Sequence, residues 1–251
     1  MISAVIIVKD GERHLADVLA AVRGCAEVLV LDSGSTDRTL EIARAAGARV
    51  ETQAFLGYGA QKNRAVELAR HDWILSLDAD EVLDAAGQAA LAGLRLADPA
   101  CSWRLRRRTF VGTRELRHGH LNDAPIRLFN RTVTRFSESI VHESVAARGP
   151  VAVLNGSVAH YAFRDAADLV QRGAGYARLK AKLYQDQGRG SSALGLVVRA
   201  AAAFVKSYVL KAGFLDGRLG VVSALSAALN ATTALAMAMP DPASPATSRD
   251  L

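Results

Sequence analysis

The chain has 251 residues, half of them apolar, and a formal net charge of +6, so it can bury the core of one large α/β domain with or without an appendage. Its two cysteines, Cys25 and Cys101, lie far apart and outside any metal-ligand spacing, which favours buried thiols in a reducing compartment over a disulfide. Lys9 and Asp10 come too early for the apolar region of a signal peptide, so we expect none at this end.

Strand-like and helical patterns alternate along residues 1–98. Apolar runs predict strands at 2–8, 28–31, 49–52 and 73–77, and helical spacing or capping residues predict helices at 11–22, 37–46 and 60–70. Because strands that alternate with helices of this length form parallel sheets with covered faces, we expect an α/β fold. Ligands bind beyond the carboxyl ends of such strands, which is where Asp32 and Asp78 stand.

The pattern changes after residue 98. Short strand-like pieces at 102–105, 126–129, 151–154 and 158–161 alternate with polar loops, and residues 166–186 have a helical pattern. From Leu194 onward Ala, Val and Leu dominate, and residues 219–239 carry no charge. Residues 240–251 are polar, and we expect a disordered tail there.

Charge is divided unevenly along the chain. Residues 1–100 hold 10 Lys and Arg against 15 Asp and Glu, whereas residues 101–218 hold 20 against 8. The basic second half indicates an anionic partner, such as a phosphorylated sugar, a membrane surface or nucleic acid. Nucleic acid is the least favoured, because no aromatic-interleaved platform accompanies the charge.

Two carboxylates, Asp78 and Asp80, follow the predicted strand 73–77. Such a hard-oxygen pair suits Mg²⁺ or Mn²⁺ bound to a diphosphate, where the cation would neutralise charge on the departing nucleotide. The alternative is a solvated strand end whose acids cap a helix.

A second polar cluster, residues 32–37, follows the strand predicted at 28–31. Asp32 can accept hydrogen bonds from a ribose hydroxyl or a base N–H, and Gly34 lets the backbone turn closely. An ordinary strand–loop–helix turn explains the same residues, since Asp, Ser and Thr are common capping residues. No G-x-G-x-x-G follows the first strand, which argues against a dinucleotide-dependent oxidoreductase.

The ordered motifs resemble family 2 inverting glycosyltransferases, which have a GT-A fold. The similar pieces in the nucleotide-sugar half are residues 3–9, 32–37, 57–65 and 73–81. A narrower likeness, to the bacterial lipopolysaccharide core-biosynthesis glucosyltransferase branch, rests on residues 127–129, 141–143, 160–161 and 213–218. The resemblance covers residues 1–230 and implies a Rossmann-like, mostly parallel sheet flanked by helices, with a C-terminal helical appendage.

The resemblance also implies roles for parts of the chain. Residues 1–98 would bind the nucleotide sugar and 99–165 the acceptor, while the apolar composition predicts a helical, membrane-associating segment at 166–239. Donor contacts are expected from Val8, Asp32, Ser33, Gln61, Lys62, Asn63, Asp78, Ala79 and Asp80. The metal is expected on Asp80 and Asp78, and the acceptor or diphosphate at Arg127, His142 and His160. On charge alone, Lys62 can equally belong to a solvated helix face.

Two stretches depart from the pattern of that branch. An Asn-Glu pair commonly follows the first-strand Lys, whereas Lys9 is followed here by Asp10 and Gly11, so nucleotide contacts there can differ. An aromatic Gly-Gly-Trp-type segment is replaced by residues 119–123, Gly-His-Leu-Asn-Asp, so the acceptor sugar can differ too.

An inverting transfer needs a general base that takes the proton of the acceptor hydroxyl, and a carboxylate can do this. Residues 101–218 hold few acids, and among them Glu143 is the first candidate and Asp123 the second. The alternative for Glu143 is an ion pair with a nearby arginine.

Six arginines form a basic run that either faces solvent or contacts acceptor phosphate or anionic lipid, namely Arg104, Arg106, Arg107, Arg108, Arg114 and Arg117. Residues 194–239 are long enough to span a bilayer, yet the polar residues within 219–239 make a weak span. We favour an interfacial helical segment whose Lys206, Lys211 and Arg218 reach headgroups, and the alternative is a core helix.

Together these observations predict a metal-dependent inverting glycosyltransferase that moves a hexose, with glucose favoured, from a nucleoside diphosphate sugar, with UDP favoured. The acceptor would be a lipopolysaccharide core or another lipid-linked saccharide at the cytoplasmic face of the inner membrane, where the protein would be peripheral. One rival is a nucleotidyltransferase that makes a sugar nucleotide, although residues 9–13 are a poor phosphate loop. The other is a non-catalytic, membrane-bound nucleotide-sugar-binding protein.

Overall fold

The computed structural model describes residues 1–137, 144–187 and 191–238. The chain divides into two compact units, one made of residues 1–115 and 122–163 and the other of residues 116–121 and everything from Arg164 onward. The predicted site residues His142 and Glu143 and the predicted tail 240–251 lie outside the described residues.

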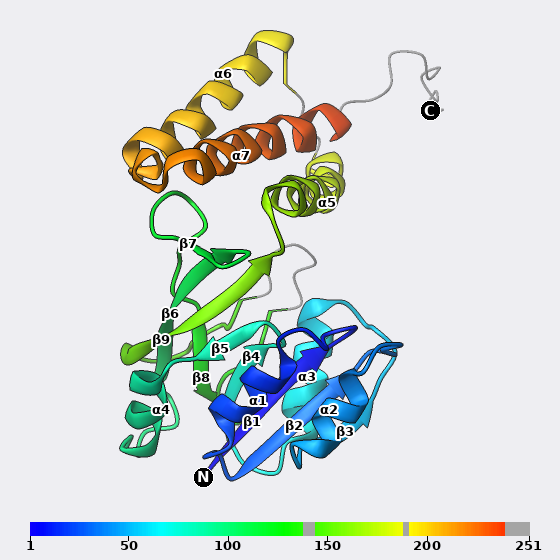
Figure 1. Ribbon diagram of the computed structural model, residues 1–251, viewed down its shortest axis with the longest axis vertical. Helices are drawn as coiled ribbons and strands as arrows, with labels where there is room; N and C mark the ends of the chain where they lie inside the picture. Colours follow the sequence, from blue (N-terminus) through cyan, green and yellow to red (C-terminus); the bar gives the residue numbers. More distant parts are fainter. Residues whose placement is uncertain (138–143, 188–190, 239–251) are drawn as a thin grey trace, which may run out of the picture. The chain divides into compact units, whose positions relative to one another are not determined.

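Nine strands of the described chain form one mixed sheet in the order β3-β2-β1-β4-β8-β6-β9-β5, with β7 paired to β6 (Figure 1). They are β1 (Ile2–Val8), β2 (Glu27–Asp32), β3 (Arg49–Thr52), β4 (Trp73–Asp78), β5 (Glu81–Leu83), β6 (Ser102–Val111), β7 (Arg114–Leu116), β8 (Ile126–Asn130) and β9 (Val151–Phe163). The first four strands are parallel to one another, and β8 continues the sheet antiparallel to β4.

Helices cover both faces of the parallel part of the sheet. The helices of the first unit are α1 (Leu15–Val22), α2 (Thr39–Ala45), α3 (Tyr58–Leu68) and α4 (Ala85–Ala92). Because successive side chains of a strand point to opposite faces, Ile6 packs with the α1 side of the core and Val5 with the α3 side. Burial on both faces explains why these strands are continuous apolar runs in the sequence.

The predicted α/β class with a C-terminal helical region is confirmed, while several element bounds differ from the prediction. Helix α1 begins at Leu15 rather than residue 11, because the backbone N–H groups of Asp10, Gly11 and Glu12 donate to side chains of residues 35–39, between β2 and the start of α2. Strand β9 is one strand of 13 residues, whereas the sequence predicted two pieces. Strand β5 and helix α4 were not predicted.

Gly156 explains both the wrong division of β9 and its packing on α4. Its φ is +120°, and a Cβ at this position would lie 2.3 Å from the Gly87 nitrogen. This close approach lets Ser157 donate its hydroxyl to Asp84 (2.6 Å), the residue whose side chain caps α4. Beyond that contact, β9 runs antiparallel to β5 and brings His160 opposite Glu81.

The second unit is helical. Its elements are α5 (Ala166–Asp186), α6 (Ala193–Val205), the π-helical turn η1 (Lys206–Leu210), the 3₁₀ turn η2 (Gly213–Asp216) and α7 (Gly217–Ala238). Helix α7 packs on both α5 and α6. The loop of residues 116–121 belongs to this unit, because the backbone N–H groups of Arg117 and His118 donate to the Asp216 carboxylate over 3.1 and 2.8 Å.

We expect Gly156→Ala to lower the free energy of unfolding by about 2–4 kcal/mol, because the new Cβ combines an unfavourable φ with a clash against backbone. Urea unfolding followed by circular dichroism measures the change. Gly24→Ala is the matched control, since a Cβ at Gly24 has no atom within 4 Å and its stability should change by less than about 0.5 kcal/mol. Equal effects from the two substitutions would contradict this account of β9.

Candidate functional site

Asp32 and Asp78 stand on either side of β1 at the carboxyl edge of the parallel strands. Val8 is in register with Asp32 of β2, and Ile7 is in register with Asp78 of β4. The sequence had placed both acids at strand ends, and the register now shows that a single strand separates them. This edge is where parallel α/β sheets bind ligands.

Asp32 is buried and organises its own loop. Its carboxylate accepts hydrogen bonds from the backbone N–H groups of Gly34 (2.9 Å) and Ser35 (3.1 Å), and from the Ser35 hydroxyl. The backbone N–H of Ser33 donates to the carbonyl of Val8 over 2.8 Å, which ties the loop to β1. The strand–loop–helix turn that was the alternative prediction is therefore present. Contacts of Val8, Asp32 and Ser33 with the nucleotide sugar remain predictions.

Asp78 lies between two buried cations. Lys62 Nζ is 2.9 Å from one carboxylate oxygen and Arg127 Nη2 is 2.9 Å from the other, and both cationic side chains are only 4% exposed. Burial alone would raise the pKa of Asp78, but the charges of Lys62 and Arg127 outweigh it and hold that pKa well below its usual range. Asp78 is thus ionised at any ordinary pH, and both its oxygens are already engaged.

Arg127 also holds the other end of the turn that follows β4. Burial would lower its pKa, but its guanidinium contacts both Glu81 and Asp78, and the two acids raise the pKa instead. The Asp78 backbone N–H donates to the second Glu81 carboxylate oxygen over 3.2 Å. The turn that carries Asp80 is therefore clamped at residues 78 and 81.

The ion pairs extend from this clamp along β6. Arg107 lies 3.6 Å from Glu81 and donates two hydrogen bonds of 2.7 Å to Asp123. Burial would lower the pKa of Arg107, but Asp123 and Glu81 raise it. Within the described chain, side chains of alternating sign thus form one series, which we name the charge chain: Lys62, Asp78, Arg127, Glu81, Arg107 and Asp123. Alternation matters because a buried charge is tolerated only when it is paired.

Asp123, the second candidate for the general base, is the outer end of the charge chain. Both its carboxylate oxygens accept from Arg107, and its backbone carbonyl accepts from the Arg107 N–H over 2.9 Å. A bidentate pair of this kind must open before the carboxylate can take a proton. Glu143 lies outside the described residues, so the choice between the two candidates stays a prediction.

Asp80 and His160 face each other across the clamped turn and β9. The distance from His160 Nε2 to the Asp80 carboxylate is 3.6 Å, with side-chain exposures of 18% and 32%. The backbone N–H of Tyr161 donates to the Asp80 carbonyl over 2.9 Å, which fixes the separation of the two segments. The second ring nitrogen of His160, Nδ1, is buried without a hydrogen-bond partner in the described structure.

These two side chains fit a divalent cation that takes its other ligands from substrate. Two ligands about 2.1 Å from one ion lie roughly 3–4 Å apart, which matches their separation. The described residues contain no group of three or more His, Cys, Asp and Glu that could hold a metal alone. Mg²⁺ is commonly bound by one or two carboxylates together with substrate phosphates, so the sparse donor set suits a diphosphate-bound ion.

Three consecutive residues of α3 connect the site to three different segments. Gln61 donates to the Ser33 hydroxyl (3.0 Å), Lys62 pairs with Asp78, and Asn63 exchanges two hydrogen bonds with the Phe136 backbone (3.1 and 3.0 Å). Gln61 and Lys62 are buried rather than presented on a solvated helix face. Contacts of these residues with the nucleotide sugar stay predictions. The contacts observed here connect α3 to the carboxyl edge of the parallel strands.

The loop after β1 is locked to the loop after β2. The N–H groups of Asp10, Gly11 and Glu12 donate to Ser35, Thr39 and Asp37 over 2.8, 2.8 and 3.0 Å. These N–H groups are therefore not available to cradle a triphosphate, which argues against the nucleotidyltransferase rival. Asp10 has a φ of +51°, a conformation that Asp and Asn tolerate best among residues with a side chain.

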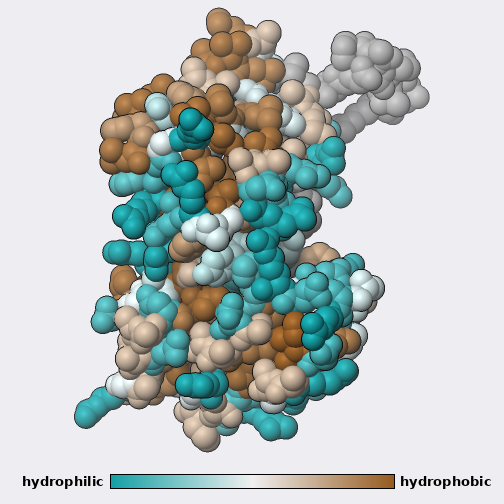
Figure 2. Space-filling view, viewed as in Figure 1, coloured by the Kyte–Doolittle hydropathy of each residue, from teal (hydrophilic) through white to brown (hydrophobic). Residues whose placement is uncertain are grey.

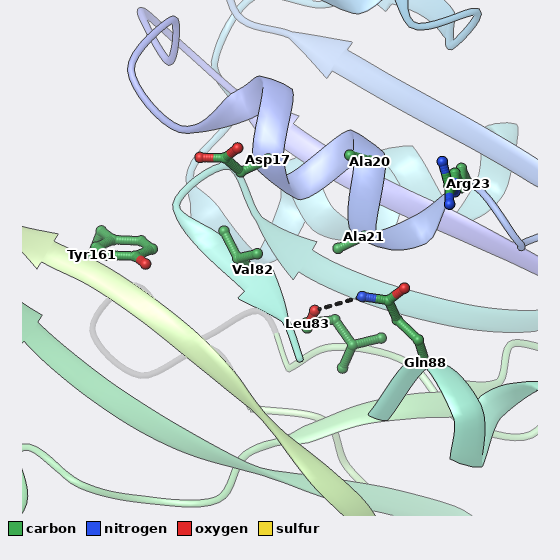
Figure 3. A pocket seen from close by; sticks show the side chains of 8 residues that line it. All are labelled: Asp17, Ala20, Ala21, Arg23, Val82, Leu83, Gln88 and Tyr161. Atoms are coloured by element: carbon green, nitrogen blue, oxygen red, sulfur yellow. Dashed lines mark hydrogen bonds between the residues drawn. The ribbon is translucent and has the colours of Figure 1, made fainter. Parts of the chain in front are cut away.

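A cavity of about 360 Å³ lies beside this region, between α1, β5, α4 and β9 (Figure 3). Its lining is Asp17, Ala20, Ala21, Arg23, Val82, Leu83, Gln88 and Tyr161. Gln88 donates to the Leu83 carbonyl at its floor over 3.0 Å. None of the predicted donor residues lines it, so we do not assign the donor to this cavity.

Sequence reasoning missed Glu81 and Arg107 as members of the site. Glu81 follows Asp80 directly and resembled a solvated capping acid, yet it is fully buried. Arg107 was one of six similar arginines in the basic run. The alternation of β6 separates the exposed Arg104 and Arg106 from Arg107, but only the pairing of β6 with its neighbours shows what Arg107 contacts.

Comparison with protein families places the first unit. The family model described as Glycosyl transferase family 2 matches residues 3–147. An uncharacterised glycosyltransferase of Rickettsia felis is 30% identical over 247 residues, covering 89% of this chain and 84% of that protein. The lipopolysaccharide core biosynthesis glycosyltransferase LpsC of Rhizobium meliloti is 28% identical over 246 residues, covering 92% and 88%.

Solved structures show the same fold at low identity. Glucosyl-3-phosphoglycerate synthase from Mycobacterium tuberculosis, in complex with phosphoglyceric acid, aligns with a TM-score of 0.51 and 20% identity, over 76% of this chain and 81% of that one. The same enzyme with Mn²⁺, uridine diphosphate and phosphoglyceric acid also gives 0.51 at 20% identity, over 76% and 80%. These matches confirm the predicted GT-A class of fold.

We expect Arg127→Met to lower the free energy of unfolding by about 3–5 kcal/mol, because it leaves Asp78 and Glu81 without their shared cation. Arg127→Lys should recover only part of this, since an ammonium lacks the planar fork. Urea unfolding at neutral pH gives both values. Arg106→Met, on an exposed arginine, is the control and should change stability by about 0.5 kcal/mol or less. A similar small effect for Arg127→Met would mean that the clamp does not stabilise the fold.

Proposed function

Because the chain belongs to glycosyltransferase family 2, we propose that it transfers a hexose, with glucose favoured, from UDP-sugar to a lipopolysaccharide-core or other lipid-linked saccharide, with inversion at the anomeric carbon. The observation that carries this proposal is the pairing of Asp80 with His160 of β9. Asp80 lies on the turn after β4, which Arg127 clamps at both ends. A rigid, partly exposed acid at the carboxyl edge of a parallel sheet suits the diphosphate end of a nucleotide sugar.

The same residues support the proposal that the enzyme depends on a divalent metal. We assign Mg²⁺ or Mn²⁺ to Asp80 and His160, with Asp78 as a neighbour whose charge Lys62 and Arg127 already balance. A bound ion would supply charge neutralisation for the departing diphosphate. The glucosyl-3-phosphoglycerate synthase structures hold Mn²⁺ with uridine diphosphate or with UDP-glucose, which supports the choice of metal and donor.

The proposed chemistry is a single displacement. The oxygen of the acceptor hydroxyl attacks the anomeric carbon from the face opposite the diphosphate, and its proton passes to the Glu143 carboxylate. The bond from the anomeric carbon to the diphosphate oxygen breaks, and its electron pair stays on that oxygen. Arg127 contributes indirectly, because it holds the turn that positions Asp80. His142 remains proposed for the acceptor side.

The acceptor is proposed from the relatives and from charge. The matching Rhizobium meliloti protein is named for lipopolysaccharide core biosynthesis. The described structure also has two helical segments, Ala193–Leu210 and Gly213–Ala238, that are long and apolar enough to cross a membrane by length and composition. Together with the basic second half of the chain, these features support a peripheral enzyme at the cytoplasmic face of the inner membrane.

We expect Asp80→Asn to abolish the Mn²⁺-dependent part of the thermal stabilisation that UDP gives to the protein, because the ion loses its carboxylate ligand. His160→Gln should weaken it less, and transfer from UDP-glucose should fall by about 100-fold or more in Asp80→Asn. Differential scanning fluorimetry with UDP, in Mn²⁺ and in EDTA, measures the first effect. Asp72→Asn is the control, because Asp72 also pairs with an arginine, Arg131, but its side chain is 56% exposed. Full Mn²⁺ dependence in both site variants would place the ion elsewhere.

We expect Glu143→Gln to lower kcat by about 10²- to 10⁴-fold while leaving the stabilisation by UDP and Mn²⁺ unchanged, because the amide cannot accept the acceptor proton. Steady-state transfer and the same thermal assay separate the two effects. Asp123→Asn is the comparison, and it should mainly reduce stability because Arg107 loses the nearer of its two acidic partners. Loss of donor binding in Glu143→Gln would mark Glu143 as a structural residue instead of the base.

A further inference from the structure

The two long apolar helices of the second unit, α6 and α7, differ in how much of their surface is buried. Helix α7 has buried residues along most of its length, from Gly220 to Ala238, because it packs on both α5 and α6. Helix α6 has no buried residue in its 13 positions, and the segment Ala193–Leu210 is only 6% buried. Figure 2 shows apolar residues gathered over this part of the molecule. Of the two helices, α6 is therefore the one left largely uncovered.

The exposed apolar residues of α6 form one stripe. At about 100° per residue, they fall within an arc of roughly 100°. The stripe consists of Leu194, Val197, Val198, Ala201 and Val205, whose large members are 73%, 64%, 58% and 44% exposed. The opposite side of the helix carries Leu196, Ala200 and Ala203, which are less exposed, as expected of a side that packs on α7.

The turn that follows α6 extends the stripe. Val209, Leu210, Phe214 and Leu215 are 52%, 76%, 49% and 61% exposed. The reversal into α7 is tight, since a Cβ at Gly220 would lie 1.8 Å from the Gly213 carbonyl oxygen. These four exposed side chains lie in the short connection between α6 and α7, where they add to the apolar surface of α6.

Basic residues border the stripe on one side. Arg199 and Lys206 project about 120–140° from Leu194, between the exposed stripe and the side that packs on α7. Lys211 and Arg218 follow, and all four are exposed. Residues 193–218 contain four Lys and Arg against one acid, and that acid, Asp216, already accepts hydrogen bonds from the backbone of Arg117 and His118.

We propose that α6, together with η1 and η2, is an interfacial anchor that lies along an anionic lipid bilayer. The aliphatic stripe enters the boundary between headgroups and acyl chains, and Arg199, Lys206 and Lys211 contact anionic headgroups. A second copy of the chain fits less well, because a symmetric contact would bring the same cations face to face. This anchor rests on the peripheral location proposed above. Helix α6 would make the membrane contact, and α7, on which α6 packs, would support it.

Flotation of the full chain with lipid vesicles tests the anchor. We expect binding to phosphatidylcholine vesicles that contain about 30% phosphatidylglycerol and weak binding to phosphatidylcholine alone. Val197→Glu/Val205→Glu should reduce the partition coefficient about tenfold or more. Leu225→Glu/Leu229→Glu, on residues of α7 that are 55% and 47% exposed, is the matched control and should change it less than about twofold.

A second pair of variants tests the charges. Arg199→Gln/Lys206→Gln should remove the preference for anionic vesicles, whereas Arg178→Gln/Lys182→Gln, on exposed residues of α5, should preserve it. Equal losses for the α6 and α7 variants, or no vesicle binding by the native chain, would overturn the proposal. A native dimer that Val197→Glu/Val205→Glu converts to monomer would assign the stripe to a second copy.

Hydrolysis of UDP-glucose in Mn²⁺ without vesicles, measured on the same preparations, keeps this inference separate from the proposed function. We expect the α6 variants to retain it, because they are exposed substitutions in the second unit. Vesicle binding without hydrolysis by the native chain would contradict the proposed function and leave the anchor standing. Hydrolysis without vesicle binding would do the reverse.

Discussion

The site depends on one guanidinium. Arg127 is almost fully buried and contacts Asp78 at one end of the turn after β4 and Glu81 at the other, so a single side chain from β8 fixes the segment that carries Asp80. Arg127 is stable there because it pairs with both acids, which in turn have Lys62 and Arg107 as further cationic partners. Each member of the charge chain is costly when buried alone and acceptable when the others are in place.

The charge chain also explains why the sheet must be complete before the site exists. Its members come from α3, β4, β5, β6, β8 and the segment between β7 and β8, and Asp78 and Arg127 are 49 positions apart in the sequence. The antiparallel pairing of β8 with β4 brings Arg127 to the end of the parallel strands. No side chain of such a set can move singly without leaving a charge unpaired, which suits the preorganised diphosphate site proposed above.

The parallel half of the fold could be predicted from sequence because its strands are buried on both faces and therefore continuous in apolar residues. The location of Asp32 and Asp78 followed from the same pattern. Lys62 could not be placed, since its buried partner lies on another element and a helical Lys usually faces solvent. The pairing of Asp123 with Arg107 could not be predicted either, because the two residues are 16 positions apart and meet only through the fold. Strand β9 could not be predicted as one strand, because sequence does not show the close approach of Gly156 to Gly87.

The loop of residues 116–121 makes the two units inseparable in sequence. Its amides at Arg117 and His118 are satisfied by Asp216, which lies 99 and 98 residues further along the chain. During synthesis the ribosome must therefore produce most of the protein before this loop can be capped, and a fragment ending near residue 163 would leave it open. Producing the first unit by itself thus requires replacing this loop as well as ending the chain after β9.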